Sequence, residues 1–239
     1  MSCARNGKLV KVVFAGESGV GKTSVIERLT NGLFTEQNPT VGAAFSVKKF
    51  SSEGKSVMLG IWDTAGQERY QAMSCVYFRD TAVCVLVFDL TDHRSFERIQ
   101  MWKHLCSEAN LKYNVASKTE KQRATEKQRA GTSLINNCGV ESSGIPIYVL
   151  VGNKLDKRGR EVDQSEIDKF CQENQIEHYV ETSARNGTGV KTLHETIGEE
   201  ACDLVVLMMD RGIELSNAVN TVRINDLESG QSRKCMCDV

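Results

Sequence analysis

A glycine-rich stretch near the start of the chain has the residue types and spacing of a phosphate-binding loop. It reads G-x-x-x-x-G-K-[ST] from Gly16 to Thr23, a pattern in which glycines let several backbone N–H groups point at one anion. In that pattern Lys22 reaches the β- and γ-phosphates and the Thr23 hydroxyl ligates Mg²⁺. We therefore predict nucleoside triphosphate contacts at Gly16, Glu17, Ser18, Gly19, Val20, Gly21, Lys22, Thr23 and Ser24.

A second motif indicates which base the nucleotide carries. The run Asn153-Lys154-Leu155-Asp156 reads N-K-x-D, and a carboxylate at its last position accepts hydrogen bonds from guanine N1–H and the 2-amino group. Adenine cannot donate that pair, and leaving the carboxylate unpaired is costly, so such a site rejects ATP. Taken alone, the stretch is also compatible with an ordinary polar strand end. The predicted base contacts are Asn153, Lys154 and Asp156, with backbone N–H groups of Ser183 and Ala184 directed at guanine O6.

A third stretch, Asp63-Thr64-Ala65-Gly66-Gln67, has the residues needed for hydrolysis. It follows an apolar run, as a metal-binding carboxylate of this kind should, and Asp63 can hold Mg²⁺ through water. The N–H of Gly66 can approach the γ-phosphate, and Gln67 can orient the attacking water. The alternative for Gln67 is a solvated loop residue without a catalytic role.

The hydropathy pattern predicts the elements that position these motifs. Alternating strands and helices are typical of an α/β fold, here a doubly wound, mostly parallel six-stranded sheet with one antiparallel hairpin strand. Ligands bind at the carboxyl ends of strands in such sheets, so all of the motifs are expected at one edge. Strands are predicted at 9–15, 44–50, 57–62, 82–88, 147–151 and 178–182, and helices at 23–29, 92–109, from 163 and from 190.

Composition excludes several other classes. The chain has 239 residues and a net charge of −1, which argues against a nucleic-acid binder held by bulk electrostatics. Its nine cysteines include no C-x-x-C pair, so a reducing compartment fits better than a disulfide framework. No signal peptide is evident at the start, and the apolar run at 204–209 is too short to span a bilayer.

A polar insert of about 110–143 interrupts the predicted core between a helix and a strand. A short loop normally joins such elements. The insert contains a perfect tandem of T-E-K-Q-R-A from Thr119 to Ala130, rich in good helix formers but without apolar residues that could dock it. It is either a solvated expansion or a contact surface, and its purpose stays open.

Together these motifs resemble the small GTPases of the Ras superfamily and, within it, the Rab family. The resemblance covers roughly 8–204 apart from the insert, and its most specific part is the run from Trp62 to Tyr70. It implies the small G domain of the P-loop NTPases, with 1–209 as the GTP-binding domain and 210–239 as a flexible tail. The stretches that carry it are 16–23, 39–45, 61–70, 153–156 and 181–184.

The resemblance assigns further roles. Thr40 would be the switch threonine that closes on Mg²⁺ and the γ-phosphate only in the triphosphate state, and Phe34 would lie against the guanine ring. Lys22, Thr40, Gly66 and Gln67 would then serve catalysis, and Thr23, Thr40 and Asp63 would hold Mg²⁺. Phe45, Trp62 and Tyr77 match the aromatic triad that Rab effectors bind, although half-buried core residues are the plainer interpretation. Both can hold.

Besides the insert, which is the largest departure, three features depart from the family pattern. Arg185 replaces the usual lysine after Ser183-Ala184, and its backbone contact to the nucleotide is expected to survive. Asp80 replaces a usual glycine at the end of switch II and is expected to alter regulator binding. The tail carries Cys235 and Cys237, a C-x-C arrangement like a Rab double-prenylation site but followed by two further residues. Unmodified cysteines are the alternative there.

The resemblance implies a GTP/GDP-regulated switch that hydrolyses GTP and recruits effectors in vesicular membrane trafficking. The alternative is a nucleotide-locked scaffold with little hydrolysis, and a P-loop ATPase or nucleotide kinase is a second one. Implied partners are effectors, an exchange factor, a GTPase-activating protein, a prenylation escort and a GDP-dissociation inhibitor, with no nucleic acid. The expected location is the cytoplasmic face of an endosomal or other vesicular membrane, with a cytosolic pool.

Overall fold

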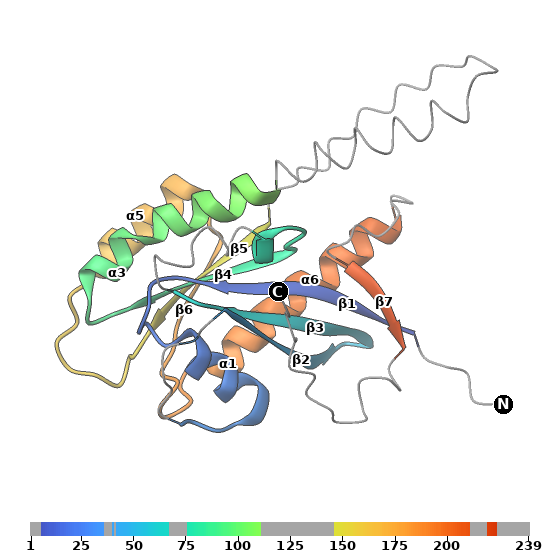
Figure 1. Cartoon of the computed structure of the whole chain (residues 1–239), viewed down its shortest axis with the longest axis horizontal. Coiled ribbons are helices and arrows are strands. Elements are labelled where there is room, and N and C mark those ends of the chain that lie inside the picture. The colour runs from blue at the N-terminus through green and yellow to red at the C-terminus, as the bar shows by residue number, and fades with distance from the viewer. Residues whose placement is uncertain are drawn as a thin grey trace, which may run out of the picture.

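The central element is a sheet with the order β2-β3-β1-β4-β5-β6 (Figure 1). The computed structural model describes residues 6–35, 40, 42–66, 76–110, 146–210 and 219–223. Strand β2 is antiparallel to β3, and the other neighbours along this path are parallel. The predicted sheet of six strands with one antiparallel hairpin strand is therefore confirmed. The strands are β1 (Asn6–Ala15), β2 (Ala43–Ser52), β3 (Lys55–Thr64), β4 (Val83–Asp89), β5 (Ile147–Asn153) and β6 (His178–Glu181).

Helices cover both faces of the sheet (Figure 1). On one face lie α1 (Lys22–Asn31) and α6 (Val190–Asp210), which bury their apolar residues in one core cluster. On the other lie α3 (His93–Glu97), a helix at 99–110 and α5 (Gln164–Asn174). Alternate residues of β4 enter the two clusters, since Val85 faces the first and Leu86 the second. Burial on both faces explains the uninterrupted apolar run of this strand.

The structure defines three local features that the sequence pattern outlined: a hairpin turn, a helix and a helix start. The β2–β3 hairpin turns on Glu53 and Gly54 alone, both at positive φ (49° and 80°), which is the two-residue turn that matches strand twist. The helix predicted at 92–109 is broken at Arg98, which caps α3 before the helix at 99–110 begins. The capping box predicted from Asp163 and Glu166 is confirmed at the start of α5.

A seventh strand, β7 (Val219–Arg223), was not predicted. It pairs antiparallel with the first half of β1, in a register from Asn6↔Arg223 to Val10↔Val219. Strand β4 pairs with β1 only from Val12 onward, so β7 occupies the edge that β4 leaves open. An open strand edge exposes unpaired backbone N–H and C=O groups, and β7 supplies partners for those of β1. Five residues of the predicted flexible tail therefore form part of the sheet.

The predicted insert begins one residue later than expected, because Asn110 belongs to the core. Its side chain is 3 % exposed; Oδ1 accepts from the Thr81 N–H (3.0 Å) and Nδ2 donates to the carbonyls of Phe78 and Cys106 (2.8 Å each). A buried amide that satisfies three backbone groups is costly to remove. Residues 111–145, which hold the T-E-K-Q-R-A tandem, lie outside the described residues.

Replacing Gly198 with alanine is expected to destabilise the fold. Gly198 lies in α6, where an added Cβ would come within 2.1 Å of Cγ and 2.2 Å of Cδ2 of Phe50. The Phe50 ring is buried and packs edge-on against His194, with centroids 5.5 Å apart. Overpacking of this kind costs about 1–3 kcal/mol and exceeds the ~1 kcal/mol gain in helix propensity.

Urea unfolding of the Gly198→Ala variant measures this loss. The double variant that also carries Phe50→Leu is the matched control, because a smaller, non-planar side chain leaves space for the new methyl group. We expect the second change to recover part of the lost stability. Equal unfolding free energies for wild type and Gly198→Ala would contradict the packing argument.

Candidate functional site

The P-loop folds around the ammonium group of Lys22. Strand β1 ends at Ala15 and α1 begins at Lys22, so the intervening loop lies at the carboxyl edge of the sheet. Lys22 is only 6 % exposed, and its Nζ donates to the carbonyls of Gly16 and Glu17 at 2.8 Å each. Burial lowers the pKa of Lys22 to about 8, against the opposing charges of Asp63 and Glu17. A buried cation at a helix N-terminus is suited to binding phosphate.

Three oxygen-bearing side chains meet beside this lysine. The Thr23 hydroxyl donates to Asp63 Oδ2 (2.7 Å) and lies 2.8 Å from the Thr40 hydroxyl. Burial raises the pKa of Asp63, although the Thr23 hydrogen bond and the Lys22 charge oppose the rise. The second carboxylate oxygen, Oδ1, is buried and has no hydrogen-bond partner among the residues that the structure describes. Such an unsatisfied oxygen needs a ligand or a water molecule.

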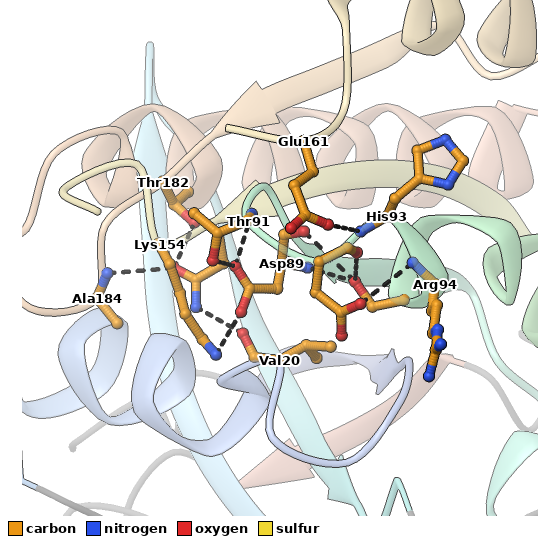
Figure 2. Close-up of polar contacts among 12 residues, drawn as sticks. Val20, Asp89, Thr91, His93, Arg94, Lys154, Glu161, Thr182 and Ala184 are labelled. Atoms are coloured by element: carbon orange, nitrogen blue, oxygen red, sulfur yellow. Dashed lines mark hydrogen bonds and ion pairs between the residues drawn. The ribbon is translucent and has the colours of Figure 1, made fainter. Parts of the chain in front are cut away.

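At the other end of the site, Asn153 joins three segments. Its Nδ2 donates to the carbonyl of Val20 (2.8 Å), and its Oδ1 accepts from the Thr182 hydroxyl (3.1 Å) and the Ala184 N–H (3.3 Å). Figure 2 labels the three partners, Val20, Thr182 and Ala184. Asn153 is 1 % exposed. The asparagine predicted as a base contact therefore also fixes the P-loop against the loops that follow β5 and β6.

The Asp156 carboxylate, which the sequence predicts as a base contact, is held in place by a neighbouring hydroxyl. The Ser183 hydroxyl donates to Asp156 Oδ1 at 2.5 Å, and Arg185 Nη1 lies 4.0 Å from Oδ2. The Ser183 N–H donates to the Thr188 carbonyl (2.9 Å), so the expected contact of this N–H with guanine O6 is not supported. Only the Ala184 N–H, with its long bond to Asn153, is left for that contact.

A partly buried ion pair orients the lysine of the N-K-x-D motif. Lys154 Nζ lies 2.6 Å from Asp89 Oδ2, and the backbone N–H and hydroxyl of Thr91 donate to Asp89 Oδ1 (2.9 and 2.8 Å) (Figure 2). Burial favours the neutral acid, but the hydrogen bonds from Lys154 and Thr91 outweigh it and lower the pKa of Asp89. Asp89 ends β4, one strand away from Lys154.

The motifs enclose a single cleft of about 370 Å³. Its lining combines residues of the P-loop and α1 with residues of the N-K-x-D motif and of the loop after β6. The predicted residues Phe34 and Arg185 also border it. The lining consists of Gly19, Gly21, Ser24, Phe34, Asn153, Lys154, Asp156, Lys157, Ala184 and Arg185.

Comparison with known proteins identifies the family. The family model described as "Ras family" matches residues 11–141 and 132–203. The chain is 32 % identical over 202 residues to Ras-related protein Rab7A of Mesembryanthemum crystallinum, covering 83 % of this chain and 84 % of that protein. It is 31 % identical over 232 residues to the Ypt/Rab-type GTPase ypt7 of Schizosaccharomyces pombe, covering 96 % and 97 %. It is 28 % identical over 229 residues to Ras-related protein Rab-18 of Lymnaea stagnalis, covering 95 % of each chain. The chain belongs to the Rab family of small GTPases.

As a Rab protein it binds GTP and GDP, hydrolyses GTP and acts in membrane trafficking through effectors and regulators. The alternative of a nucleotide-locked scaffold is not favoured. Among the described residues no helix has the length and apolar character to cross a bilayer.

The aromatic residues predicted for effector binding lie together on this Rab protein. The Phe45 and Trp62 ring centroids are 5.1 Å apart, and those of Trp62 and Tyr77 are 5.8 Å apart. Phe45 is 39 % exposed. Lys11 lies beneath, with Nζ 5.1 Å from the Trp62 ring centroid and 2.6 Å from the carbonyl of Arg79. The triad is therefore a partly exposed cluster supported by a lysine from β1, which the sequence did not indicate.

Two further site residues escaped the sequence analysis. Arg28 in α1 donates from Nε to the Ala184 carbonyl (2.9 Å) and from Nη2 to the Arg185 carbonyl (2.6 Å), and thereby fixes the loop after β6. Lys157 lines the cleft. Neither residue belongs to a recognisable motif. Arg28 in particular acts on residues more than 150 positions away in the sequence.

Not every predicted functional residue belongs to the described part of the chain. Gln67, Cys235 and Cys237 lie outside the described residues.

Asp80, where the family usually has glycine, adopts a positive φ of 53°. Asp tolerates this left-handed conformation better than most side chains, so the substitution keeps the backbone geometry of a glycine position.

Proposed function

We propose that the cleft binds GTP with its phosphates on the P-loop and its guanine between Asn153 and Asp156. The observation that carries this proposal is that one cleft is lined by both motifs, which lie more than 130 residues apart in the sequence. Phe34 and Arg185 border the guanine from opposite parts of the chain. The Asp156 carboxylate accepts the two guanine donors, which gives the selectivity over ATP.

The oxygen cluster beside Lys22 fits Mg²⁺. Hard oxygen donors are the ligands that Mg²⁺ prefers, and the buried Asp63 Oδ1 accepts no hydrogen bond from the described part of the chain. Thr23, Thr40 and Asp63 would hold the ion, directly or through water. When bound, Mg²⁺ neutralises charge on the phosphates.

In the proposed reaction, water attacks the γ-phosphorus as the bond to the β-phosphate oxygen breaks, which gives GDP and phosphate. Lys22 contacts the β- and γ-phosphates, the Gly66 N–H donates to the γ-phosphate, and Gln67 orients the water. Thr40 reports the γ-phosphate, so its loss on hydrolysis releases the switch segments and their effector surface.

Replacing Gln67 with leucine is expected to lower GTP hydrolysis while leaving GTP binding intact. Leucine has no group that can orient water. Intrinsic turnover of this class is on the order of 10⁻⁴ s⁻¹, and a GTPase-activating protein raises it by roughly 10³–10⁵-fold. We expect the variant to lose most of the stimulated rate in single-turnover phosphate release. An unchanged stimulated rate, with normal GTP affinity, would contradict the role of Gln67.

We further propose that prenyl groups on Cys235 and Cys237 attach the protein to the cytoplasmic face of an endosomal or other vesicular membrane. Two lipid chains suffice for stable anchoring, whereas one does not. A prenylation escort and a GDP-dissociation inhibitor would then maintain a cytosolic pool, while an exchange factor and a GTPase-activating protein set the nucleotide state. Mass spectrometry of the C-terminal peptide tests the modification. An unmodified peptide in the membrane fraction would contradict it.

A further inference from the structure

The side chain of Glu17, the second residue of the P-loop, is bound to a helix outside the loop. Its Oε1 accepts hydrogen bonds from Trp102 Nε1 and Arg98 Nε, both at 3.1 Å. Both donors belong to the stretch that caps α3 and continues as the helix at 99–110. The phosphate loop is thereby joined to the helix layer on the opposite face of the sheet from α1.

The two donors differ in how firmly they are held. Trp102 is fully buried and packs edge-on against Phe78 with centroids 6.4 Å apart. Its indole has a single N–H donor, and Glu17 satisfies it. The Arg98 side chain is 48 % exposed, and exposed ion pairs contribute little. Trp102 is therefore the main anchor of the Glu17 carboxylate.

The backbone of Glu17, in contrast to its side chain, lies against Lys22 and Gly66. Its carbonyl accepts one of the two hydrogen bonds from Lys22 Nζ (2.8 Å). A Cβ added to Gly66 would come within 2.4 Å of both the Glu17 carbonyl carbon and Lys22 Nζ. The Glu17 peptide thus abuts both groups that the proposed function directs at the γ-phosphate.

We propose that Glu17 is a positioning residue, whose carboxylate is anchored by Trp102 so that its peptide holds Lys22 and Gly66 in register for the γ-phosphate. This inference rests on the proposed function. GDP has no γ-phosphate, so loosening the Glu17 peptide affects GTP more than GDP. The predicted insert follows the described part of the helix at 99–110 directly in the sequence, so the anchor also joins the start of the insert to the P-loop.

The test compares Glu17→Ala, Glu17→Gln and Trp102→Phe in the full chain. Phenylalanine keeps an aromatic ring in the core but lacks the N–H donor, and glutamine keeps an acceptor oxygen. For each variant we measure the dissociation constants of GTP and GDP, single-turnover hydrolysis and thermal unfolding. Glu173→Ala, on α5 and paired only with exposed Lys169 among the described contacts, is the matched control.

We expect Glu17→Ala and Trp102→Phe each to lower the GTP-to-GDP affinity ratio and the hydrolysis rate by roughly tenfold, with GDP affinity changed less than threefold. Glu17→Gln should keep most of the wild-type affinity ratio and hydrolysis rate. The double variant Glu17→Ala with Trp102→Phe should lose no more than Glu17→Ala alone, because both changes break the same interaction. Equal losses of GTP and GDP affinity, additive effects, or wild-type values in Glu17→Ala would each overturn the proposal. If Glu17→Ala does not fold, Trp102→Phe and Glu17→Gln decide. A wild-type protein that bound neither nucleotide would instead overturn the proposed function.

Discussion

Replacing Lys22 with methionine is expected to weaken binding of both GTP and GDP by roughly 10²–10³-fold, since hydrogen bonds to charged groups contribute about 1.5–3 kcal/mol each. The cation is already in the P-loop, buried and held by the carbonyls of Gly16 and Glu17. Methionine has a similar length but neither charge nor donor. The loss should be larger for GTP, because in the proposed function the lysine also contacts the γ-phosphate.

Fluorescent-nucleotide titration measures this loss. Lys191→Met is the matched control, because Lys191 is an exposed lysine of α6 that pairs with Glu195 at i,i+4. The midpoint temperature of thermal unfolding of the nucleotide-free variant should not fall. A neutral methionine avoids the desolvation cost of a buried charge, which is also the cause of the lowered pKa of Lys22. Unchanged GTP affinity in a folded Lys22→Met protein would refute the assignment of the P-loop.

The second large effect is expected at the base. Asp156→Asn should weaken GTP binding by roughly 10³–10⁴-fold, because the new amide N–H₂ meets the N–H donors of guanine and leaves them unpaired. The Asn oxygen can still accept from the Ser183 hydroxyl, which lies 2.5 Å from Asp156 Oδ1. The surrounding loop should therefore keep its conformation.

Xanthosine triphosphate is the decisive competitor in this experiment. Its base has a carbonyl at C2 where guanine has an amino group, so it can accept from the new Asn amide. We expect the variant to prefer it over GTP and the wild type to prefer GTP over both it and ATP. Asp168→Asn, on the exposed face of α5 where Gln164 donates to the carboxylate (2.8 Å), is the control. If Asp156→Asn kept the wild-type order of affinities, the guanine would not be read at Asp156.

The proposed lipid attachment of the tail can be tested separately from nucleotide binding. Neither variant alters the tail, and both leave the aromatic cluster of Phe45, Trp62 and Tyr77 unchanged. A Lys22→Met protein that still carried prenyl groups would therefore separate lipid attachment from nucleotide state.

The sequence by itself determined the family, the fold and most of the cleft. The P-loop, N-K-x-D and the stretch after Trp62 are local patterns, in which neighbouring residues act on one ligand, and each follows a strand that the hydropathy pattern predicts. The apolar run of β4 predicts burial on both faces without any knowledge of its neighbours. These features depend on residues close together in the chain, so a linear pattern can indicate them.

The tertiary structure decided which distant residues support those motifs. Arg28 fixes the loop at Ala184, Asp89 holds Lys154, and Trp102 binds Glu17, and each pair is joined only by the packing of helices and strands. It also decided that the Ser183 N–H donates to Thr188, and that β7 returns to pair with β1. No periodicity or spacing carries such information, because a contact between remote segments depends on the register and packing of every element between them.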